Sequence, residues 1–284
     1  MAEAAVKAVR GPWLNRRRRT LCTIGLGAIL LAGIFVWGSL LGPGDYGPNY
    51  SARYVAPCAD HPFGTDSLGR DMFFRVVAGL SLSIRIGLLA AVISSVIALV
   101  LGSLSAVFGG WADSAVSYCV DLCMGVPHLI LLILISIAAG GGAAGVVTGV
   151  AVTHWPNLTR LIRAEILQIR SAQYVQVAQK MGKGPLHIAL RHIVPHVFPQ
   201  YAVGLILLFP HAILHEAGIT FLGYGLPLDT PAMGVILAES MRHLAAGMWW
   251  LAFFPGLALL LVVQLFDVVG DSLRVFVDPH AARE

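Results

Sequence analysis

The sequence predicts an all-α, polytopic membrane protein with six transmembrane helices and both termini in the cytoplasm. Of its 284 residues, 57% are hydrophobic and only 12% are charged, whereas about 25% of the residues in a soluble domain are charged. Apolar runs of about 20 residues recur, which is the length that a helix needs to cross a bilayer. The mean hydropathy of +0.78 agrees with this class.

The chain starts with a basic cytoplasmic tail, residues 1–20, followed by an apolar run, residues 21–41. The run is longer than the core of a usual signal peptide, which has about 7–15 residues, and no small-residue cleavage site follows it. It is therefore predicted to be an uncleaved first transmembrane helix. The arginine block Arg16–Arg19 holds its start in the cytoplasm by the positive-inside rule, and this block is interpreted as a topology signal rather than as a nucleic-acid site.

Residues 42–79 are predicted to form an extracytoplasmic loop with an interfacial helix. The stretch His61–Arg75, HPFGTDSLGRDMFFR, combines turn residues with a candidate helix cap, Thr65 or Ser67. Its two aspartates balance its two arginines, so the segment predicts a tightly turned loop that is close to neutral.

Residues 80–270 are predicted to form the transmembrane core, and residues 271–284 a cytoplasmic tail. Spans two to six are expected at about 80–108, 113–140, 143–161, 197–219 and 249–269. Asp121 falls inside the third span, where a charge costs about 2.5–3.5 kcal/mol on insertion scales. Its side chain is therefore expected to face the bundle or to lie close to the cytoplasmic edge.

The longest polar interruption of the core is an elbow, residues 170–199, which is predicted to be helix, break, helix. Gly182 suits the position after a helix end, where a positive φ is often needed, and Pro185 suits the first turn of the next helix. Pro195 is expected to end that helix or to admit the next one. Since the break leaves backbone groups that need water or protein, the elbow must lie on one membrane face, where it can fill a groove of another protein.

The distribution of cations supports this topology. Of the 19 Lys and Arg residues, fourteen fall in segments assigned to the cytoplasm, four fall in outer segments, and Arg85 lies within a span. Six spans with both termini inside fit this asymmetry, whereas five or seven do not.

No enzyme motif is present. The elbow dipeptide Gly182-Lys183 is followed by glycine rather than Ser or Thr, so there is no P-loop, and His215-Glu216 is followed by Ile219 rather than by the second histidine of a zinc-protease motif. We therefore expect no catalytic residue and no cofactor bound by this chain.

No metal site is expected either. His192 and His196 are four residues apart, and structural hydrogen bonding is favoured for them over metal binding. Cys119 and Cys123 share a helix face, but ordinary packing is favoured because no other soft ligand is near in the sequence.

Four ionisable residues within the predicted spans are candidates for the transport pathway. They are His211, His215, Glu216 and Asp121. An ionisable group in the membrane is by default a functional candidate, yet helix packing is favoured for the two histidines and the glutamate.

Five stretches in order resemble the permease subunits of ABC importers in the dipeptide/oligopeptide/nickel group, of the DppC or OppC type. His61–Arg75 resembles the group's H-P-x-G-T-D-x-x-G-R-D signature, and Trp155–Arg163 resembles its W-P-x-x-x-R-x-x-R segment. Gln176–Pro195 resembles the EAA coupling loop. Glu216–Pro227 resembles E-A-x-x-S-F-L-G-x-G-x-P with Thr220 in place of Ser, and Phe266–Pro279 resembles the closing pattern of the group.

The resemblance implies a type I ABC importer permease fold and assigns two sets of residues. Those of the ATPase-coupling loop are Gln176, Val177, Ala178, Gly182, Arg191, His192 and Pro195. Those of the extracytoplasmic signature are His61, Gly64, Asp66, Gly69, Arg70 and Asp71. The sequence departs from the family where the usual acid is Gln176 and the first alanine is Val177, so a salt bridge from position 176 is not expected.

The implied partners are a second permease of the DppB or OppB type, two ATP-binding subunits or domains that bind ATP and Mg²⁺, an extracytoplasmic solute-binding protein and the lipid bilayer. The implied location is the bacterial cytoplasmic membrane. Di- and oligopeptides are the expected substrates, with nickel or a haem-like compound as alternatives that the sequence leaves open. An ion-coupled secondary transporter is disfavoured because no internal repeat is evident. No role is assigned to Cys58.

Overall fold

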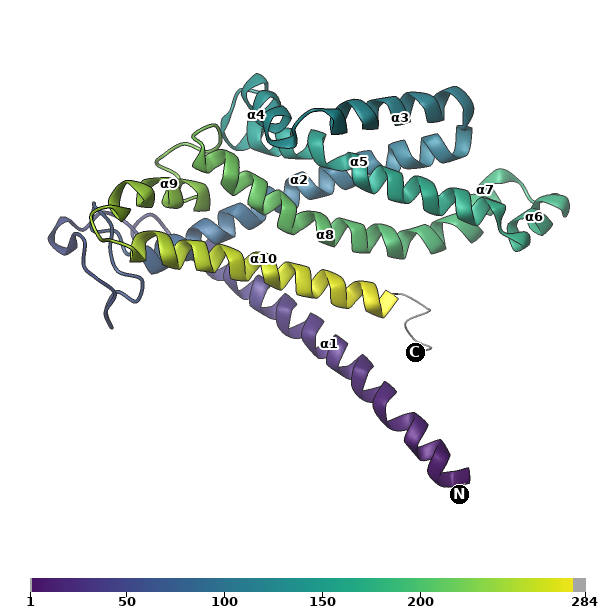
Figure 1. The fold of residues 1–284 in the computed structure, drawn as a ribbon, viewed down its shortest axis with the longest axis horizontal. Coiled ribbons are helices and arrows are strands. Elements are labelled where there is room, and N and C mark those ends of the chain that lie inside the picture. The colour runs from purple at the N-terminus through teal and green to yellow at the C-terminus, as the bar shows by residue number, and fades with distance from the viewer. Residues whose placement is uncertain (1, 278–284) are drawn as a thin grey trace.

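The computed structural model describes residues 2–277, and their backbone is almost entirely helical (Figure 1). The elements are α1 (Ala2–Leu40), the 3-10 turn η1 (Tyr50–Ala52), α2 (Met72–Phe108), α3 (Gly110–Gly125), α4 (His128–Ala138), α5 (Gly142–Ser171), α6 (Gln173–Lys180), α7 (Pro185–Ile188), the π-helical turn η2 (Ala189–Ile193), α8 (Val194–Phe221), α9 (Met233–Leu244) and α10 (Trp250–Val277). No β-strand occurs in these residues, and the all-α prediction is confirmed.

Four helical segments are long and apolar enough to cross a membrane: Arg18–Leu40, Met72–Phe108, Ala189–Phe221 and Trp250–Phe276. The pair α3 and α4 passes the same test together, but is bent by 100°. Helix α5, the predicted fourth span, is not among them. Its second half carries Arg160, Arg163, Glu165 and Arg170. The number six is consistent with this arrangement and stays a prediction.

Different segments of the chain lie at the two ends of the molecule (Figure 1). The loop after α1 and helix α9 lie at one end. The elbow formed by α6 and α7, the start of α1 and the end of α10 lie toward the other end. The predicted topology requires this separation, with the basic segments on one side of the bilayer and the signature loop on the other.

Helix α2 is the centre of the fold and packs against α1, α5 and α8. Small residues let these helices approach closely, as in other membrane bundles. A Cβ atom at Gly87 would lie 2.7 Å from the Ile213 side chain of α8, and one at Gly102 would lie 3.0 Å from the Thr159 carbonyl oxygen of α5. Glycine at these two positions therefore sets the distance between the central helix and the two helices that carry the candidate site.

The predicted interfacial helix within residues 42–79 is not a separate element. Helix α2 starts at Met72 and continues without interruption to Phe108. Its cap is Asp71, whose Oδ1 accepts a hydrogen bond from the Phe73 amide at 2.8 Å, rather than Thr65 or Ser67. The Thr65 hydroxyl donates instead to the Ala52 carbonyl, which ties it into the loop.

The predicted third span is broken at Pro127. Helix α3 ends at Gly125, Val126 is extended at ψ 140°, and α4 begins at His128. Proline disfavours the helical conformation of the residue before it, which accounts for the extended Val126. The 100° bend that results turns α4 across the neighbouring helices instead of continuing α3.

Both predicted tails are partly helical. Helix α1 begins at Ala2, so the basic tail and the first span form one continuous helix. Helix α10 continues to Val277, beyond the predicted end of the sixth span. Met1 and residues 278–284, with the end of the closing family pattern, lie outside the described residues.

Candidate functional site

The turn of the elbow has the geometry that its sequence predicts. Gly182 has φ 75°, and its amide donates to the Gln179 carbonyl at 3.0 Å, while the Lys183 amide donates to the Ala178 carbonyl at 3.1 Å. These two bonds form a Schellman motif, which satisfies the last carbonyls of α6 and requires a left-handed residue after the helix. Gly182 therefore fixes the direction in which the chain leaves α6.

The second half of the elbow has no break at Pro195, which lies in the first turn of α8 and so admits that helix, one of the two roles expected for it. Helix α7 passes through the π-helical turn η2 directly into α8, and the Val194 amide bonds the Ala189 carbonyl. Pro195 has no amide hydrogen for the carbonyl four residues earlier and would clash with it in a regular helix. The wider π turn relieves this clash, so α7 and η2, the second half of the elbow, form one continuous helical rod with α8.

The elbow combines a buried anchor with an exposed apolar surface. Val175 is fully buried, in a cluster with Ile169 and Ile188, and holds α6 against the bundle. Val177 is 54% exposed and Met181 is 73% exposed. These two apolar side chains of the elbow form a surface suited to a groove of another protein.

Gln176 has a partner that the family's usual acid does not have. Its Nε2 donates to the Ser171 carbonyl at 3.0 Å, so it caps the end of α5, and a carboxylate cannot donate in this way. The residue lines an open hollow of about 600 Å³ whose other walls are Leu167, Arg170, Ser171, Gln179 and Lys180. The prediction that no salt bridge starts from this position agrees with this contact.

The remaining elbow residues lie on its flank. Arg191 is exposed and forms no ion pair within the part of the chain that is described. The ring of His192 lies 5.6 Å from that of Tyr174. His196 Nδ1 lies 2.8 Å from the His192 carbonyl oxygen, which is the structural hydrogen bonding that the sequence favours for this histidine.

Two ion pairs connect α3 to α5. Arg163 holds Asp113 with two bonds, Nε to Oδ1 at 2.5 Å and Nη2 to Oδ2 at 2.7 Å, and the Ser105 hydroxyl of α2 donates to the same carboxylate. Arg160 Nη2 bonds Asp121 Oδ1 at 2.7 Å in a pair that is exposed on both sides. Asp121 is thus on the outer face of α3 and does not line the pocket described below.

The signature loop is held by a buried charge network. Asp66 Oδ2 lies 2.6 Å from Arg70 Nε and 3.0 Å from Arg75 Nη1, and Glu239 Oε2 of α9 lies 2.9 Å from Arg70 Nη2 and 2.7 Å from Arg75 Nη1. The balance of aspartate against arginine within the loop is confirmed for Asp66. Glu239 was not predicted as a member, because it lies 169 residues from Arg70 in the sequence.

The other signature residues shape the same loop. His61 Nδ1 lies 2.7 Å from Asp71 Oδ2, so Asp71 joins the loop to the start of α2. Gly64 and Gly69 both have positive φ, and a Cβ atom at Gly69 would lie 1.8 Å from the Asn49 carbonyl oxygen. The six signature residues therefore have clear structural roles in this chain.

A polar pocket of about 600 Å³ lies between the α3–α4 break, α5 and α8. Its walls are residues 123–128, Thr153, His154, Pro156 and Asn157 of α5, and Leu208, His211 and His215 of α8. The two predicted pathway histidines, His211 and His215, thus lie together in one wall. Cys123 is another wall residue, and its Sγ lies 3.8 Å from the Val152 carbonyl oxygen, which Pro156 leaves without its helical donor.

Glu216 lies away from this pocket and is fully buried. Its Oε1 accepts from the Thr220 hydroxyl at 3.1 Å, and the same hydroxyl accepts from the Leu226 amide at 3.3 Å. A Cβ atom at Gly225 would lie 2.1 Å from that hydroxyl. Glu216 and Thr220 together anchor the turn after α8, as the helix-packing interpretation of Glu216 expects.

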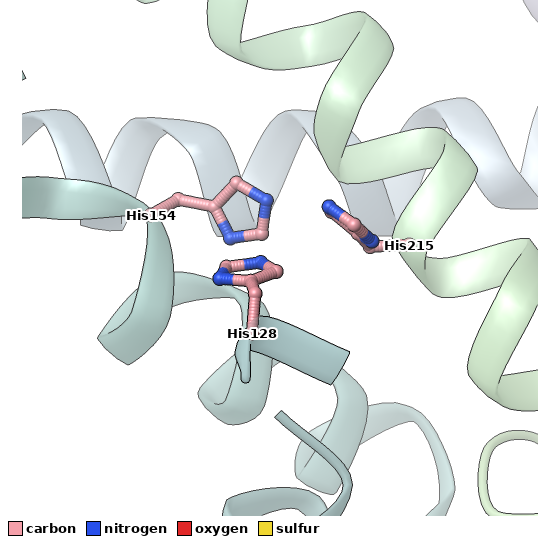
Figure 2. A group of neighbouring side chains, drawn as sticks. All are labelled: His128, His154 and His215. Carbon is pink, nitrogen blue, oxygen red and sulfur yellow. The ribbon is translucent and has the colours of Figure 1, made fainter. Parts of the chain in front are cut away.

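The pocket contains a histidine cluster that the sequence analysis missed (Figure 2). His128 at the start of α4, His154 of α5 and His215 of α8 have nitrogen atoms within 4.8 Å of one another. The sequence places them on three separate segments, and His128 enters the pocket only because the chain turns at Pro127. The signal available beforehand was the presence of ionisable groups in three membrane segments.

Comparison with known families and proteins gives consistent matches. A family model described as "Binding-protein-dependent transport system inner membrane component" matches residues 98–283. The dipeptide transport system permease protein DppC of Bacillus subtilis (strain 168) is 30% identical over 273 residues, which cover 95% of this chain and 85% of that protein. The oligopeptide transport system permease protein OppC of the same organism is 32% identical over 268 residues, which cover 94% of this chain and 88% of that protein.

Solved structures show a similar fold. The inward-facing methionine ABC transporter MetNI contains a chain that superposes with a TM-score of 0.60 at 18% sequence identity, and the match covers 73% of this chain and 98% of that chain. A chain of an amino acid ABC transporter superposes with a TM-score of 0.51 at 14% identity, covering 74% of this chain and 94% of that chain. At these identities the similarity concerns the fold alone.

Proposed function

Because the chain belongs to the family of inner-membrane components of binding-protein-dependent transport systems, we propose that it forms half of the membrane pathway of an ATP-driven peptide importer. The relatives that match nearly the whole chain are a dipeptide and an oligopeptide permease protein, which supports peptides as the substrate class. A second permease of the DppB or OppB type supplies the other half of the pathway.

The energy source and the delivery of substrate belong to other chains. This sequence has no P-loop, so two ATP-binding subunits bind ATP and Mg²⁺. A solute-binding protein delivers the peptide on the extracytoplasmic side. This chain is then a multi-pass protein of the bacterial cytoplasmic membrane whose own task is to bind these partners and to open and close the pathway.

The observation that carries the proposal is the continuity between the elbow and the pocket. The elbow residues Val177, in α6, and Met181, at the end of α6, are exposed, and α7 continues through η2 into α8. Helix α8 carries His211 and His215, which line the pocket. Movement of an ATPase docked on α6 is therefore transmitted through the Gly182 turn to α7, and from there along one continuous helix to the wall of the pathway.

Transport requires two conformations of the permease, and binding of ATP to the ATPase changes their relative stability. Closure of the ATP-bound subunits shifts the elbow, and α8 moves with it as a rod, so the pocket opens alternately to the two sides of the membrane. The network of Asp66, Arg75 and Glu239 holds the outer loop in place. ATP binding thus biases an equilibrium that this chain provides.

The turn of the elbow gives a direct test with a matched control. In Gly182→Ala the left-handed conformation costs about 1–2 kcal/mol, which corresponds to a roughly 5- to 30-fold loss of ATPase affinity if docking needs this turn. Gly184→Ala is the control, since Gly184 does not have a positive φ and has open space around it. Peptide uptake and peptide-stimulated ATP hydrolysis are measured in proteoliposomes that contain the whole transporter.

A charge reversal provides a second arm of this test. Arg191→Glu changes an exposed charge on the elbow, and we expect it to separate ATP hydrolysis from uptake while the protein still inserts and assembles. Normal coupled transport in both Gly182→Ala and Arg191→Glu would show that the elbow is not the site of coupling.

A further inference from the structure

Three imidazole rings from three helices meet in the pocket (Figure 2). The ring centroids are 4.7 Å apart for His128 and His154, 4.6 Å for His128 and His215, and 4.9 Å for His154 and His215. A ring nitrogen of each lies within 4.8 Å of a ring nitrogen of the other two. None of the three is a neighbour of another in the sequence, so the fold itself assembles the cluster.

The hydrogen bonds of His154 determine which of its nitrogens is free. Its Nδ1 lies 2.8 Å from the Val150 carbonyl oxygen, and a carbonyl only accepts, so Nδ1 carries the hydrogen. The lone pair is therefore on Nε2. A backbone carbonyl that fixes the tautomer and orientation of a histidine in this way is the usual support of a metal-binding imidazole.

The free nitrogens are buried and lack partners. The Nε2 atoms of His128 and His154 are inaccessible to solvent and make no hydrogen bond within the described part of the chain. Leaving such a buried polar atom unsatisfied costs about 1–3 kcal/mol. A bound ligand that accepts electron pairs would satisfy both atoms at once.

We propose that His128, His154 and His215 together bind one divalent transition-metal ion of the Zn²⁺, Ni²⁺ or Co²⁺ type. Imidazole nitrogen suits these ions, whereas Mg²⁺ and Ca²⁺ prefer oxygen ligands, and no carboxylate of the described residues belongs to the cluster. Bonds of about 2.0–2.1 Å bring tetrahedral ligand nitrogens to about 3.3 Å apart. The nitrogens, now within 4.8 Å, reach this separation by small ring movements.

The arrangement leaves a fourth position open. Three protein ligands with an exchangeable fourth are typical of zinc sites that bind a further molecule. Here the cluster borders a pocket of about 600 Å³, so water or a group of a passing solute completes the coordination. The metal site is therefore a part of the pathway wall that can contact the solute, and it does not depend on the solute being a peptide.

The test uses the assembled transporter, purified with a tag that contains no histidine and reconstituted in nanodiscs. Zn²⁺ bound after removal of free metal is counted per permease, and the visible absorption of added Co²⁺ reports the coordination. We expect one Zn²⁺ per chain and the absorption of tetrahedral Co²⁺ with nitrogen ligands. Mg²⁺ in excess is expected to displace neither ion.

Variants decide whether these three residues are the ligands. His128→Asn, His154→Asn and His215→Asn are each expected to raise the Zn²⁺ dissociation constant by on the order of 100-fold, at the upper end of the loss seen for supporting residues. The control is His243→Ala, a histidine of α9 that packs against Tyr54 and is not part of the cluster, and it should bind normally.

Several outcomes would overturn the proposal. They are an absence of Zn²⁺ and Co²⁺ binding by the wild-type transporter, binding that persists in the three variants, and equal loss in His243→Ala. Where a variant does not assemble, the Co²⁺ spectrum of the wild-type protein decides alone, because octahedral coordination or no spectrum is incompatible with three imidazole ligands in a tetrahedral site. Transport activity enters none of these measurements, so they stand apart from the test of the elbow.

Discussion

Arg75 is the most deeply buried cation of the charge network on the loop after α1. Its side chain is 3% exposed, and its guanidinium contacts both Asp66 and Glu239. Removal of one partner from a buried ion pair leaves an uncompensated charge, which costs about 3–5 kcal/mol. Arg75 thus matters more for the placement of α9 on the loop than an ordinary surface charge would.

The substitution Arg75→Met is therefore expected to destabilise the protein by about 3–5 kcal/mol. The control Arg53→Met removes an exposed arginine of the same loop that lies over the Tyr50 ring, with an expected cost below about 1 kcal/mol. Thermal unfolding of the purified transporter and protease cleavage of the loop measure the difference. Equal unfolding midpoints for the two variants would contradict a structural role for the network.

At the scale of single residues, backbone conformation set by near neighbours was predictable from the sequence, whereas contacts between residues far apart in the chain were not. The conformation of Gly182 follows from its place between two helical patterns, and its positive φ and Schellman bonds confirm the prediction. Glu239 and His128 were missed for one reason. Each meets its partners through the packing of distant helices, which a residue's own neighbours in the sequence do not specify.

At the scale of elements, α3 depends on ion pairs because its apolar contacts are few. Val120 is its only fully buried residue, and the contact with α5 runs through Asp113–Arg163 and Asp121–Arg160. The first pair is bidentate, about one-third exposed and shared with Ser105, whereas the second is single and more than half exposed. The two pairs join the same two helices in different surroundings.

A pair of double-mutant cycles compares them. For Asp113→Ala with Arg163→Ala we expect a coupling energy of about 1–2 kcal/mol, reduced from the value of a buried charged bond because water reaches the pair. For Asp121→Ala with Arg160→Ala we expect about 0.2–1 kcal/mol. Titration of the transporter with a denaturing detergent gives the free energy of unfolding of each variant, and from these the two coupling energies. A larger coupling for the exposed pair would refute this assignment.

The existence of the helices was predictable from hydropathy, and their interruptions were less so. The third span was predicted at about 113–140, without a break at Pro127. Proline is tolerated in membrane helices where neighbours satisfy the free carbonyl. The same residue type leaves α5 continuous at Pro156 and α8 continuous at Pro199 and Pro210. Packing against other helices decides between a break and a continuous helix, and the sequence pattern alone does not.

The topology of the whole molecule is testable with single cysteines. Cys58 is exposed in the loop after α1, and Met181 is exposed in the elbow. With the other cysteines replaced, a thiol reagent that does not cross membranes is expected to label Cys58 in cells whose inner membrane is intact. Met181→Cys, made in a background without Cys58, should be labelled only after permeabilisation. Labelling of Met181→Cys in intact cells would place the elbow outside and would exclude contact with a cytoplasmic ATPase.

Composition was sufficient to predict the class of this molecule, and the resemblance of five short stretches was sufficient to predict its family. The six spans and the side of the membrane on which each end lies stay predictions, because charge and hydropathy report them only statistically. The pocket could not be predicted from the sequence, since it exists only where α4, α5 and α8 converge.

Helix α5 lines the pocket near its centre and ends at the base of the elbow. His154 lies near its centre, and the Ser171 carbonyl at its end accepts a hydrogen bond from Gln176, about 26 Å further along the helix axis. A ligand that favours one position of this helix at either end changes the binding free energy at the other end. The change is the same in both directions, since equilibrium coupling is reciprocal. A metal ion bound by the histidines would thus change the affinity of the ATPase for the elbow, and the bound ATPase would change the affinity for the ion, through this one helix.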